Sequence, residues 1–189
     1  DWPTVESGPL TTGEARDHPH HVSLWFAHGD VDGHDFWHGG RGETIAPRRE
    51  PVVRVEDVAA VIEHDLAWRT ADGATIVDER RVLTFTAPHE DRRVLDLTVE
   101  LRSERPVTFG DTKEGTMAIR LAPTLRLSGD VAEGTMLNAA GDRDGACWGK
   151  RAAWIAMSGS VDEAPVTIAI FDHPDNPRHP TWWHARAYG

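Results

Sequence analysis

Residues 94–101 read Val94-Leu95-Asp96-Leu97-Thr98-Val99-Glu100-Leu101, and this stretch decides the fold class. Its leucines and its second valine recur at every second position, with Asp, Thr and Glu between them. A period of two matches a β-strand, whose successive side chains point to opposite faces of the sheet. The pattern therefore predicts a strand with one apolar face and one polar face.

The same alternation recurs along much of the chain. It is found in residues 62–68, 75–86, 117–127, 152–157 and 166–171. Turn sequences separate these segments at Asp72-Gly73, Ser128-Gly129 and Gly141-Asp142, of which Asp72-Gly73 is the strongest hairpin signal. Residues 55–63 fit either a strand or a short helix. Many short strands with few helical windows predict an all-β fold, an antiparallel β-sandwich or a barrel.

Length and charge limit the classes of function. A chain of 189 residues is expected to form a single domain spanning residues 1–189. Its formal charge of −11 repels phosphate backbones, so nucleic acid is not an expected partner. No apolar run approaches the roughly 20 residues that span a bilayer, and no signal region follows Asp1, so a soluble chain is expected. The sequence leaves the compartment and the oligomeric state open.

Several familiar motifs are missing from the sequence. Gly145-Ala146-Cys147-Trp148-Gly149-Lys150 has the wrong spacing for a phosphate-binding loop. Ser158-Gly159-Ser160 lacks the pattern of a nucleophile elbow and is interpreted as a turn. Cys147 is the only cysteine, so it is expected to be a small buried thiol and not a nucleophile.

Two segments that lie far apart in the sequence are both rich in histidine, aspartate and tryptophan. The first covers residues 17–38 and the second residues 172–184. Histidine titrates near neutrality, and a carboxylate can be brought there by burial, so such mixtures suit proton transfer. The two segments are therefore expected to contribute to one site. The simpler interpretation is that individual histidines are hydrogen-bonded loop residues.

The histidines near the N-terminus also allow a metal hypothesis. His18, His20 and His21 lie close together in sequence, and imidazole ligates zinc, copper and iron. The sequence contains no His-Glu-x-x-His motif, and Pro19 makes a loop the expected setting of His18 and His20. A divalent metal at these three histidines is kept as the alternative to a site without metal.

Eight tryptophans against one tyrosine is an unusual aromatic composition. Trp68 and Trp154 lie in alternating segments and are predicted to fill the core. Trp37, Trp148 and Trp183 lie in or beside polar clusters and are predicted to line a pocket, where indole rings could stack on sugars. Lys150 and Arg186 are candidate partners for anionic groups.

Long motifs of the chain resemble a family of bacterial proteins usually labelled PmoA-like, or methane oxygenase PmoA. These motifs cover residues 17–37, 109–120, 148–151 and 171–189. The label implies a methane oxygenase. The resemblance also suggests a carbohydrate-related protein with a fold similar to the galactose mutarotase group, a β-sandwich in which a histidine and a carboxylate move protons on a sugar. Family members are longer at both ends, so the resemblance implies that this chain is a fragment with strands missing.

The resemblance implies roles for individual residues. His20, His28 and His173 are candidate acids, Glu114 and Asp172 are candidate bases, and Lys113 would polarise an oxygen. The candidate substrate-binding residues are Asp17, His21, Asp35, Trp37, Arg120, Trp148, Lys150, Asn176, Trp183, His184 and Arg186.

Three functions remain open at this stage. The first is an enzyme that acts on a sugar or sugar acid by general acid-base catalysis and needs no cofactor. The second is a noncatalytic carbohydrate-binding module, in which tryptophans supply the affinity. The third is an oxygenase that depends on copper or iron and uses His18, His20 or His21 with a carboxylate.

Overall fold

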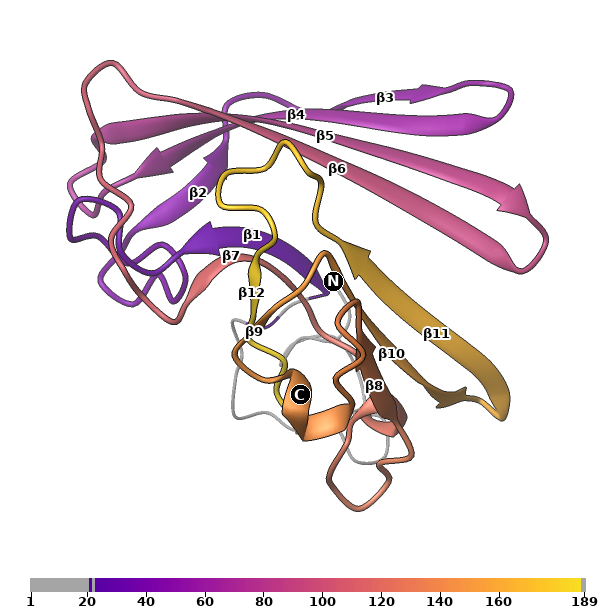
Figure 1. Cartoon of the computed structure of the whole chain (residues 1–189). Helices are drawn as coiled ribbons and strands as arrows, with labels where there is room; N and C mark the ends of the chain where they lie inside the picture. Colours follow the sequence, from indigo (N-terminus) through magenta and orange to yellow (C-terminus); the bar gives the residue numbers. More distant parts are fainter. Residues whose placement is uncertain (1–20, 22, 188–189) are drawn as a thin grey trace. The chain divides into compact units, whose positions relative to one another are not determined.

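The structure, a computed structural model, describes residue 21 and residues 23–187 (Figure 1). These residues form antiparallel β-strands and two short 3₁₀ segments, η1 (Pro123–Leu125) and η2 (Asp144–Cys147). The prediction of an all-β, antiparallel fold is confirmed. None of the described elements is a helix with the length and apolar character needed to cross a bilayer.

The chain divides into two compact units. One consists of Phe26–Thr116, and the other combines Met117–Gly189 with the residues up to Trp25. β1 (Leu24–His28) pairs with β7 (Gly115–Ile119), and the chain passes from one unit to the other within each of these two strands. The two units are described separately below.

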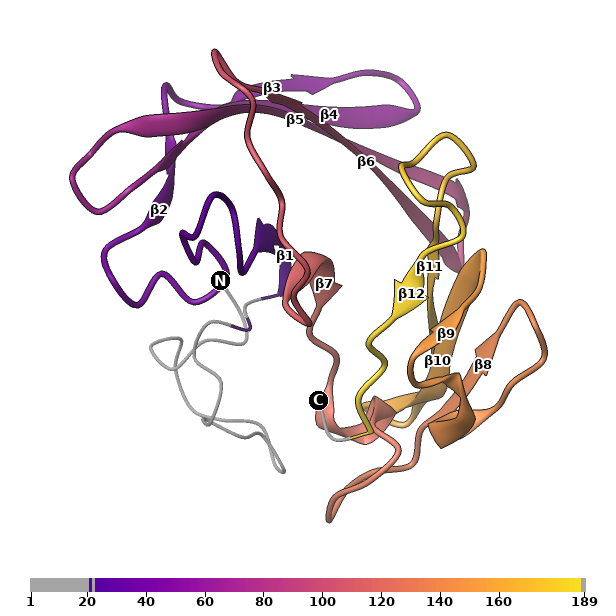
Figure 2. The same ribbon diagram turned by 60° about the vertical axis from the view of Figure 1, so that its left-hand side comes forward.

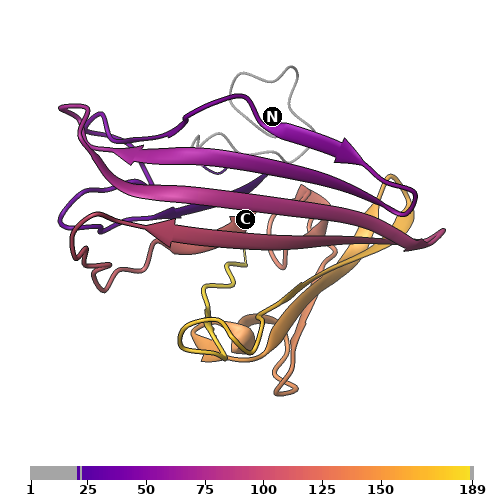
Figure 3. The ribbon, with the colours of Figure 1, turned by 90° about the horizontal axis from the view of Figure 1, so that it is seen from above.

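A five-stranded antiparallel sheet dominates the Phe26–Thr116 unit (Figure 3). Its strands are β2 (Thr44–Pro47), β3 (Val52–Val55), β4 (Ala59–Arg69), β5 (Thr75–His89) and β6 (Arg92–Arg102). β2 and β3 pair with successive parts of the same edge of β4, and β5 and β6 follow on the other side. Residues 55–63, which fitted a strand or a helix, form the end of β3, a short turn and the start of β4.

Antiparallel register gives this sheet two different faces. Ile62, Leu83 and Leu97 are direct cross-strand neighbours, so they lie on one face, together with the predicted apolar face of residues 95–101. On the opposite face Glu63 accepts hydrogen bonds from Arg54 and Arg80 of the neighbouring strands. The alternation in the sequence therefore predicted the two faces correctly.

The core of this unit covers one end of the apolar face. Val31, Trp68 and Val77 are almost fully buried, and Phe36 packs with them. The indole Nε1 of Trp68 donates a hydrogen bond to Glu79 at 2.7 Å. Trp68 is thus a core residue, as predicted, and its one polar atom has a partner.

The hairpin between β4 and β5 turns at Asp72-Gly73, as predicted. The backbone N–H of Thr70 donates to the carbonyl of Ala74 at 2.9 Å and closes the turn. The carboxylate of Asp72 accepts the N–H of Ala74 at 3.2 Å. Gly73 has a φ of +89°, a left-handed conformation that glycine adopts without strain.

The second unit contains two small antiparallel sheets (Figure 2). The first has the order β11 (Ala164–Phe171), β10 (Trp154–Val161) and β8 (Thr135–Asn138), and the second pairs β12 (Trp182–Trp183) with β9 (Lys150–Arg151). Met136, Cys147 and Ile155 form its buried cluster. Burial raises the pKa of the Cys147 thiol, whose Sγ donates to the carbonyl of Asp142, so the expectation of an inert buried cysteine fits the structure.

Two local predictions in this unit are wrong. Ser158-Gly159-Ser160 lies inside β10 and not in a turn, because these residues pair with Thr167, Val166 and Pro165 of β11. The missing side chain of Gly159 makes room for Leu125 of η1. The strand expected over residues 117–127 ends at Ile119, and Pro123 begins η1. Pro123, which has no N–H to donate to a ladder, is a local signal against the later part of the predicted strand.

The Gly159 contact gives a test of this packing. A Cβ atom at Gly159 would lie 3.0 Å from Leu125 Cδ2 and 3.4 Å from the Cα of Gly134. Gly159→Val should therefore lower the free energy of unfolding by about 1–3 kcal/mol, the usual cost of overpacking. Gly145→Ala is the control, since a Cβ at Gly145 meets no atom within 4 Å. Equal urea midpoints for the two variants would contradict the assigned contact.

Candidate functional site

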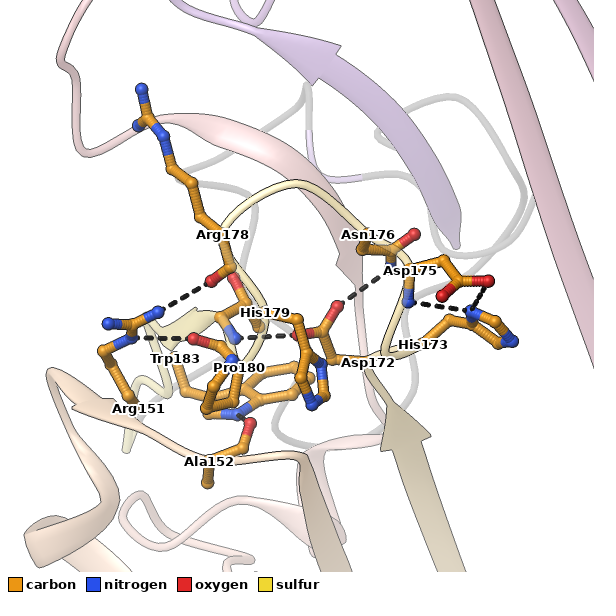
Figure 4. A network of polar contacts seen from close by, with 11 residues as sticks. Arg151, Ala152, Asp172, His173, Asp175, Asn176, Arg178, His179, Pro180 and Trp183 are labelled. Atoms are coloured by element: carbon orange, nitrogen blue, oxygen red, sulfur yellow. Dashed lines mark hydrogen bonds and ion pairs between the residues drawn. The ribbon is translucent and has the colours of Figure 1, made fainter.

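A loop of residues 172–181 connects β11 to β12 and is organised by one carboxylate (Figure 4). Asp172 Oδ1 accepts a hydrogen bond from Asn176 Nδ2 at 2.8 Å. Asp172 Oδ2 accepts two more, from His179 Nδ1 and from the backbone N–H of Thr181, both at 2.8 Å. One buried side chain therefore fixes three later positions of this loop, which we call the Asp172 loop.

The electrostatics of Asp172 keep it ionised. Its side chain is only 7% exposed, and this burial acts to raise the pKa of the carboxyl group. The hydrogen bonds from Asn176, Thr181 and His179 favour the charged form more strongly, so the net pKa of Asp172 is lowered. A carboxylate with a lowered pKa and both oxygens occupied suits an orienting role better than the base role predicted for it.

His179 is the group that Asp172 orients. Because a carboxylate only accepts hydrogen bonds, Nδ1 of His179 is the donor, and in the neutral ring the lone pair is therefore on Nε2. The His179 side chain is 23% exposed, so it is within reach of solvent. An imidazole held by a buried carboxylate is a common arrangement of a general base.

Sequence reasoning selected His173 of this loop and missed His179. The His173 side chain is 70% exposed, and its Nδ1 accepts the N–H of Asp175 at 3.2 Å. It makes no hydrogen bond to Asp172. The repeat of His-Pro at residues 173–174 and 179–180 was the available signal, but both histidines fit it equally well.

Arg151 of β9 ties the Asp172 loop to the neighbouring ladder. Its Nε donates to the carbonyl of Pro180 and its Nη2 to the carbonyl of Arg178, both at 2.8 Å. The guanidinium lies 5.8 Å from the ring centroid of Trp182. The side chain of Arg178 itself extends away from Asp172 (Figure 4).

The two adjacent tryptophans of β12 have opposite environments. Trp183 was predicted to line a pocket, but its Nε1 donates to the carbonyl of Ala152 at 2.8 Å and its ring packs against the Met136 cluster. Trp182 is 67% exposed, on the other side of the strand. Trp182 is therefore the member of the pair that a ligand could reach directly.

A second exposed indole belongs to the same unit. Trp148, 56% exposed, lies 4.9 Å from the ring of His184, which accepts a hydrogen bond from Arg186 Nε at 2.9 Å. Lys150, an exposed residue, is the cross-strand neighbour of Trp183. The structure therefore gathers Trp148, His184 and Arg186 as one group.

Other candidates lie in the Phe26–Thr116 unit. His28 Nε2 donates to the carbonyl of Gly110 at 3.0 Å, while its buried Nδ1 has no partner in the described structure and faces the backbone of Gly115. Lys113 Nζ lies 3.0 Å from Glu114 Oε1. The carbonyl of Glu114 accepts the N–H of Gly29, so these candidates lie around one strand end.

Asp35 closes a local turn near these residues. Its carboxylate accepts the N–H groups of Trp37 and His38 and also Nδ1 of His38, the last at 2.7 Å. Burial acts to raise the pKa of Asp35, but these hydrogen bonds outweigh it and lower the pKa. Trp37 is buried, with 9% exposure.

Some of the predicted site residues are not described by the structure. Asp17, His18 and His20 lie outside the described residues. His21 stacks on Trp25 with 5.1 Å between ring centroids, and the N–H of Arg120 donates to the carbonyl of Ser23. Within residue 21 and residues 23–187, no three His, Cys, Asp or Glu side chains form a metal-binding group. The metal alternative at His18, His20 and His21 stays a prediction.

Comparison with known proteins gives one family. The model described as "Family of unknown function (DUF6807)" matches residues 4–189. The chain belongs to this family. Searches of curated proteins and of solved structures found no match. For this DUF6807 member, the functional argument therefore rests on the site itself.

The lowered pKa of Asp172 predicts a pH-dependent contribution to stability. A carboxyl group whose folded pKa lies below its unfolded value stabilises the protein above the unfolded pKa and loses this effect as the pH falls through the folded one. Asp172→Asn should therefore reduce the free energy of unfolding at pH 7, and the deficit should shrink as the pH falls below about 4. Urea unfolding across this pH range measures both effects.

Asp175→Asn is the matched control, because the Asp175 side chain is 93% exposed. It should leave stability nearly unchanged at every pH. A deficit in Asp172→Asn that stays constant with pH would contradict the lowered pKa.

Proposed function

We propose that this protein is an enzyme that transfers protons on a sugar or sugar acid, with His179 as the general base. The hydrogen bond from His179 Nδ1 to Asp172 carries this proposal. In the neutral ring this bond leaves Nε2 as the unprotonated nitrogen, and the nearby carboxylate stabilises the imidazolium that forms when Nε2 accepts a proton. Asp172 acts as a positioning residue.

The exposed aromatic side chains support a carbohydrate as the ligand class. Trp182 and Trp148 present large indole surfaces to solvent, and exposed apolar surface next to polar groups often marks a binding site. The C–H faces of a sugar ring can pack on such an indole, while its hydroxyl groups stay available to polar neighbours. Lys150, Arg151 and Arg186 supply positive charge, which a sugar acid would use.

The proposed chemical step is a proton transfer that needs no redox partner. Nε2 of His179 takes a proton from a carbon or hydroxyl group of the sugar, and the imidazolium returns a proton to the product. The imidazole then regains its starting form, so the proton balance closes. The resemblance to PmoA-like proteins and the galactose mutarotase group supports the sugar by analogy only.

Substitution of His179 tests the catalytic role. His179→Gln should lower kcat at least 100-fold on the best substrate found by ¹H NMR in a panel of hexoses and uronates, because general-base catalysis contributes about 10²–10⁴-fold. His173→Gln, the control from the same loop, should stay within about twofold of the wild type.

Two results would reject this role for His179. One is a turnover rate that His179→Gln leaves unchanged, and the other is no turnover of any sugar in the panel. The second result, combined with measurable sugar binding, would support the noncatalytic binding module. The exposure of Trp182 favours that module as the second candidate function.

Trp182→Ala tests the aromatic contact in either case. Removing this indole should weaken sugar binding about tenfold, or about 1.4 kcal/mol, by isothermal titration calorimetry. Phe171→Ala is the control, because Phe171 is an exposed aromatic residue of the same unit at 73% exposure. Equal sugar affinities of Trp182→Ala and Phe171→Ala would contradict a contact between Trp182 and the sugar.

A further inference from the structure

The apolar face of the five-stranded sheet in the Phe26–Thr116 unit is only partly covered. Near Trp68 and Val77 the buried core packs against it. Farther along the strands the same face carries exposed side chains. They are Val53 at 60%, Val55 at 82%, Phe85 at 41% and Leu95 at 40% exposure. Exposed apolar patches of this kind often bind ligands.

A polar cluster interrupts the apolar face between the covered and exposed parts. Glu79 has a fully buried side chain, and its Oε2 accepts the indole N–H of Trp68. Its Oε1 accepts Nε of Arg81 at 2.6 Å. Glu79 therefore balances the charge of Arg81 and fixes the orientation of the guanidinium.

Arg81 keeps hydrogen-bonding capacity beyond this ion pair. Its Nη2 reaches the carbonyl of Phe26 only at 3.4 Å, a long contact, and no described residue accepts a hydrogen bond from Nη1. A guanidinium has five N–H donors and no acceptor. Any group that completes this cluster must therefore supply acceptor atoms.

His64 lies directly across the β4–β5 ladder from Arg81, on the same face. Cross-strand neighbours of this kind have Cβ atoms about 4.5–5.5 Å apart. Nε2 of His64 is buried and has no hydrogen-bond partner in the described structure. A buried polar atom without a partner is costly, so its presence calls for an explanation.

We propose that His64 and Arg81 bind the carboxylate of a small organic acid whose apolar body lies on this sheet face beside Leu83 and Leu97. The two oxygens of a carboxylate can accept one hydrogen bond from Arg81 and one from His64 in the tautomer that carries its proton on Nε2. Leu83 and Leu97 lead from this cluster towards Phe85 and Leu95, which offer an apolar surface to an aromatic or aliphatic body. The residues of this site all belong to the Phe26–Thr116 unit, and the proposal does not depend on the sugar proposal.

Phenylacetate and its neutral isostere phenylacetamide test the site on the full chain. Calorimetry should show phenylacetate binding at least tenfold more tightly than phenylacetamide, because only the acid supplies a charged acceptor. His64→Leu should weaken phenylacetate binding at least fivefold. The same variant should bind phenylacetamide with the affinity of the wild type. His89→Leu, which changes an exposed histidine on β5, should have no effect.

A direct readout separates binding at His64 from binding elsewhere. Long-range ¹H–¹⁵N NMR spectra of the imidazole rings should show one ring signal that moves with phenylacetate and is missing in His64→Leu. Arg81 is left unchanged because its removal would strand the buried Glu79 carboxylate. Circular dichroism melts confirm that His64→Leu is folded, and His64→Gln, which keeps a donor, should retain part of the affinity.

Several outcomes would overturn the proposal. They are no phenylacetate binding, equal binding of the acid and the amide, and equal affinity in the wild type and a folded His64→Leu variant. A dimer in analytical ultracentrifugation that phenylacetate does not dissociate, with no shift of the His64 signal, would show that a second copy covers this face. Selective binding together with the His64 shift supports the site.

Discussion

The antiparallel register of β4, β5 and β6 is the constraint on which the Phe26–Thr116 unit depends. Direct pairing of Ile62, Leu83 and Leu97 places their side chains on one face, and a shift by one residue would move them all to the charged face. Such a shift would also separate Glu63 from its two arginine partners. Apolar burial and cross-strand ion pairs therefore select the same register.

A buried carboxylate organises each unit, but the two carboxylates have different consequences. Glu79 is paired with the cation Arg81, so its negative charge is cancelled where it lies. Asp172 is held by an amide, a backbone N–H and an imidazole, none of which carries a permanent charge. The Asp172 charge is consequently available to stabilise an imidazolium at His179, whereas Glu79 mainly fixes a guanidinium.

Local patterns predicted the regular parts of the fold, and long-range pairing decided the rest. The alternation of residues 95–101, the Asp72-Gly73 turn and the burial of Trp68 each depend on near neighbours, and all three were predicted. Ser158-Gly159-Ser160 resembles a turn locally, but its pairing with β11 places it in a strand. Trp183 was predicted to line a pocket but packs against the core, because the pairing of β12 with β9 sets which of its two indoles faces inward. No local pattern contains that information.

The choice between His173 and His179 shows the same limit at the candidate site. Both histidines lie in the Asp172 loop, and His173 would be the expected partner of Asp172 if only distance along the sequence counted. The loop instead turns back, so that positions 176, 179 and 181 all reach the Asp172 carboxylate. Arg151 binds this turn through the carbonyls of Pro180 and Arg178. The guanidinium therefore does not pair with the Asp172 carboxylate. A guanidinium bound directly to Asp172 would weaken the effect of its charge on His179, so the position of Arg151 shapes the loop without cancelling that charge.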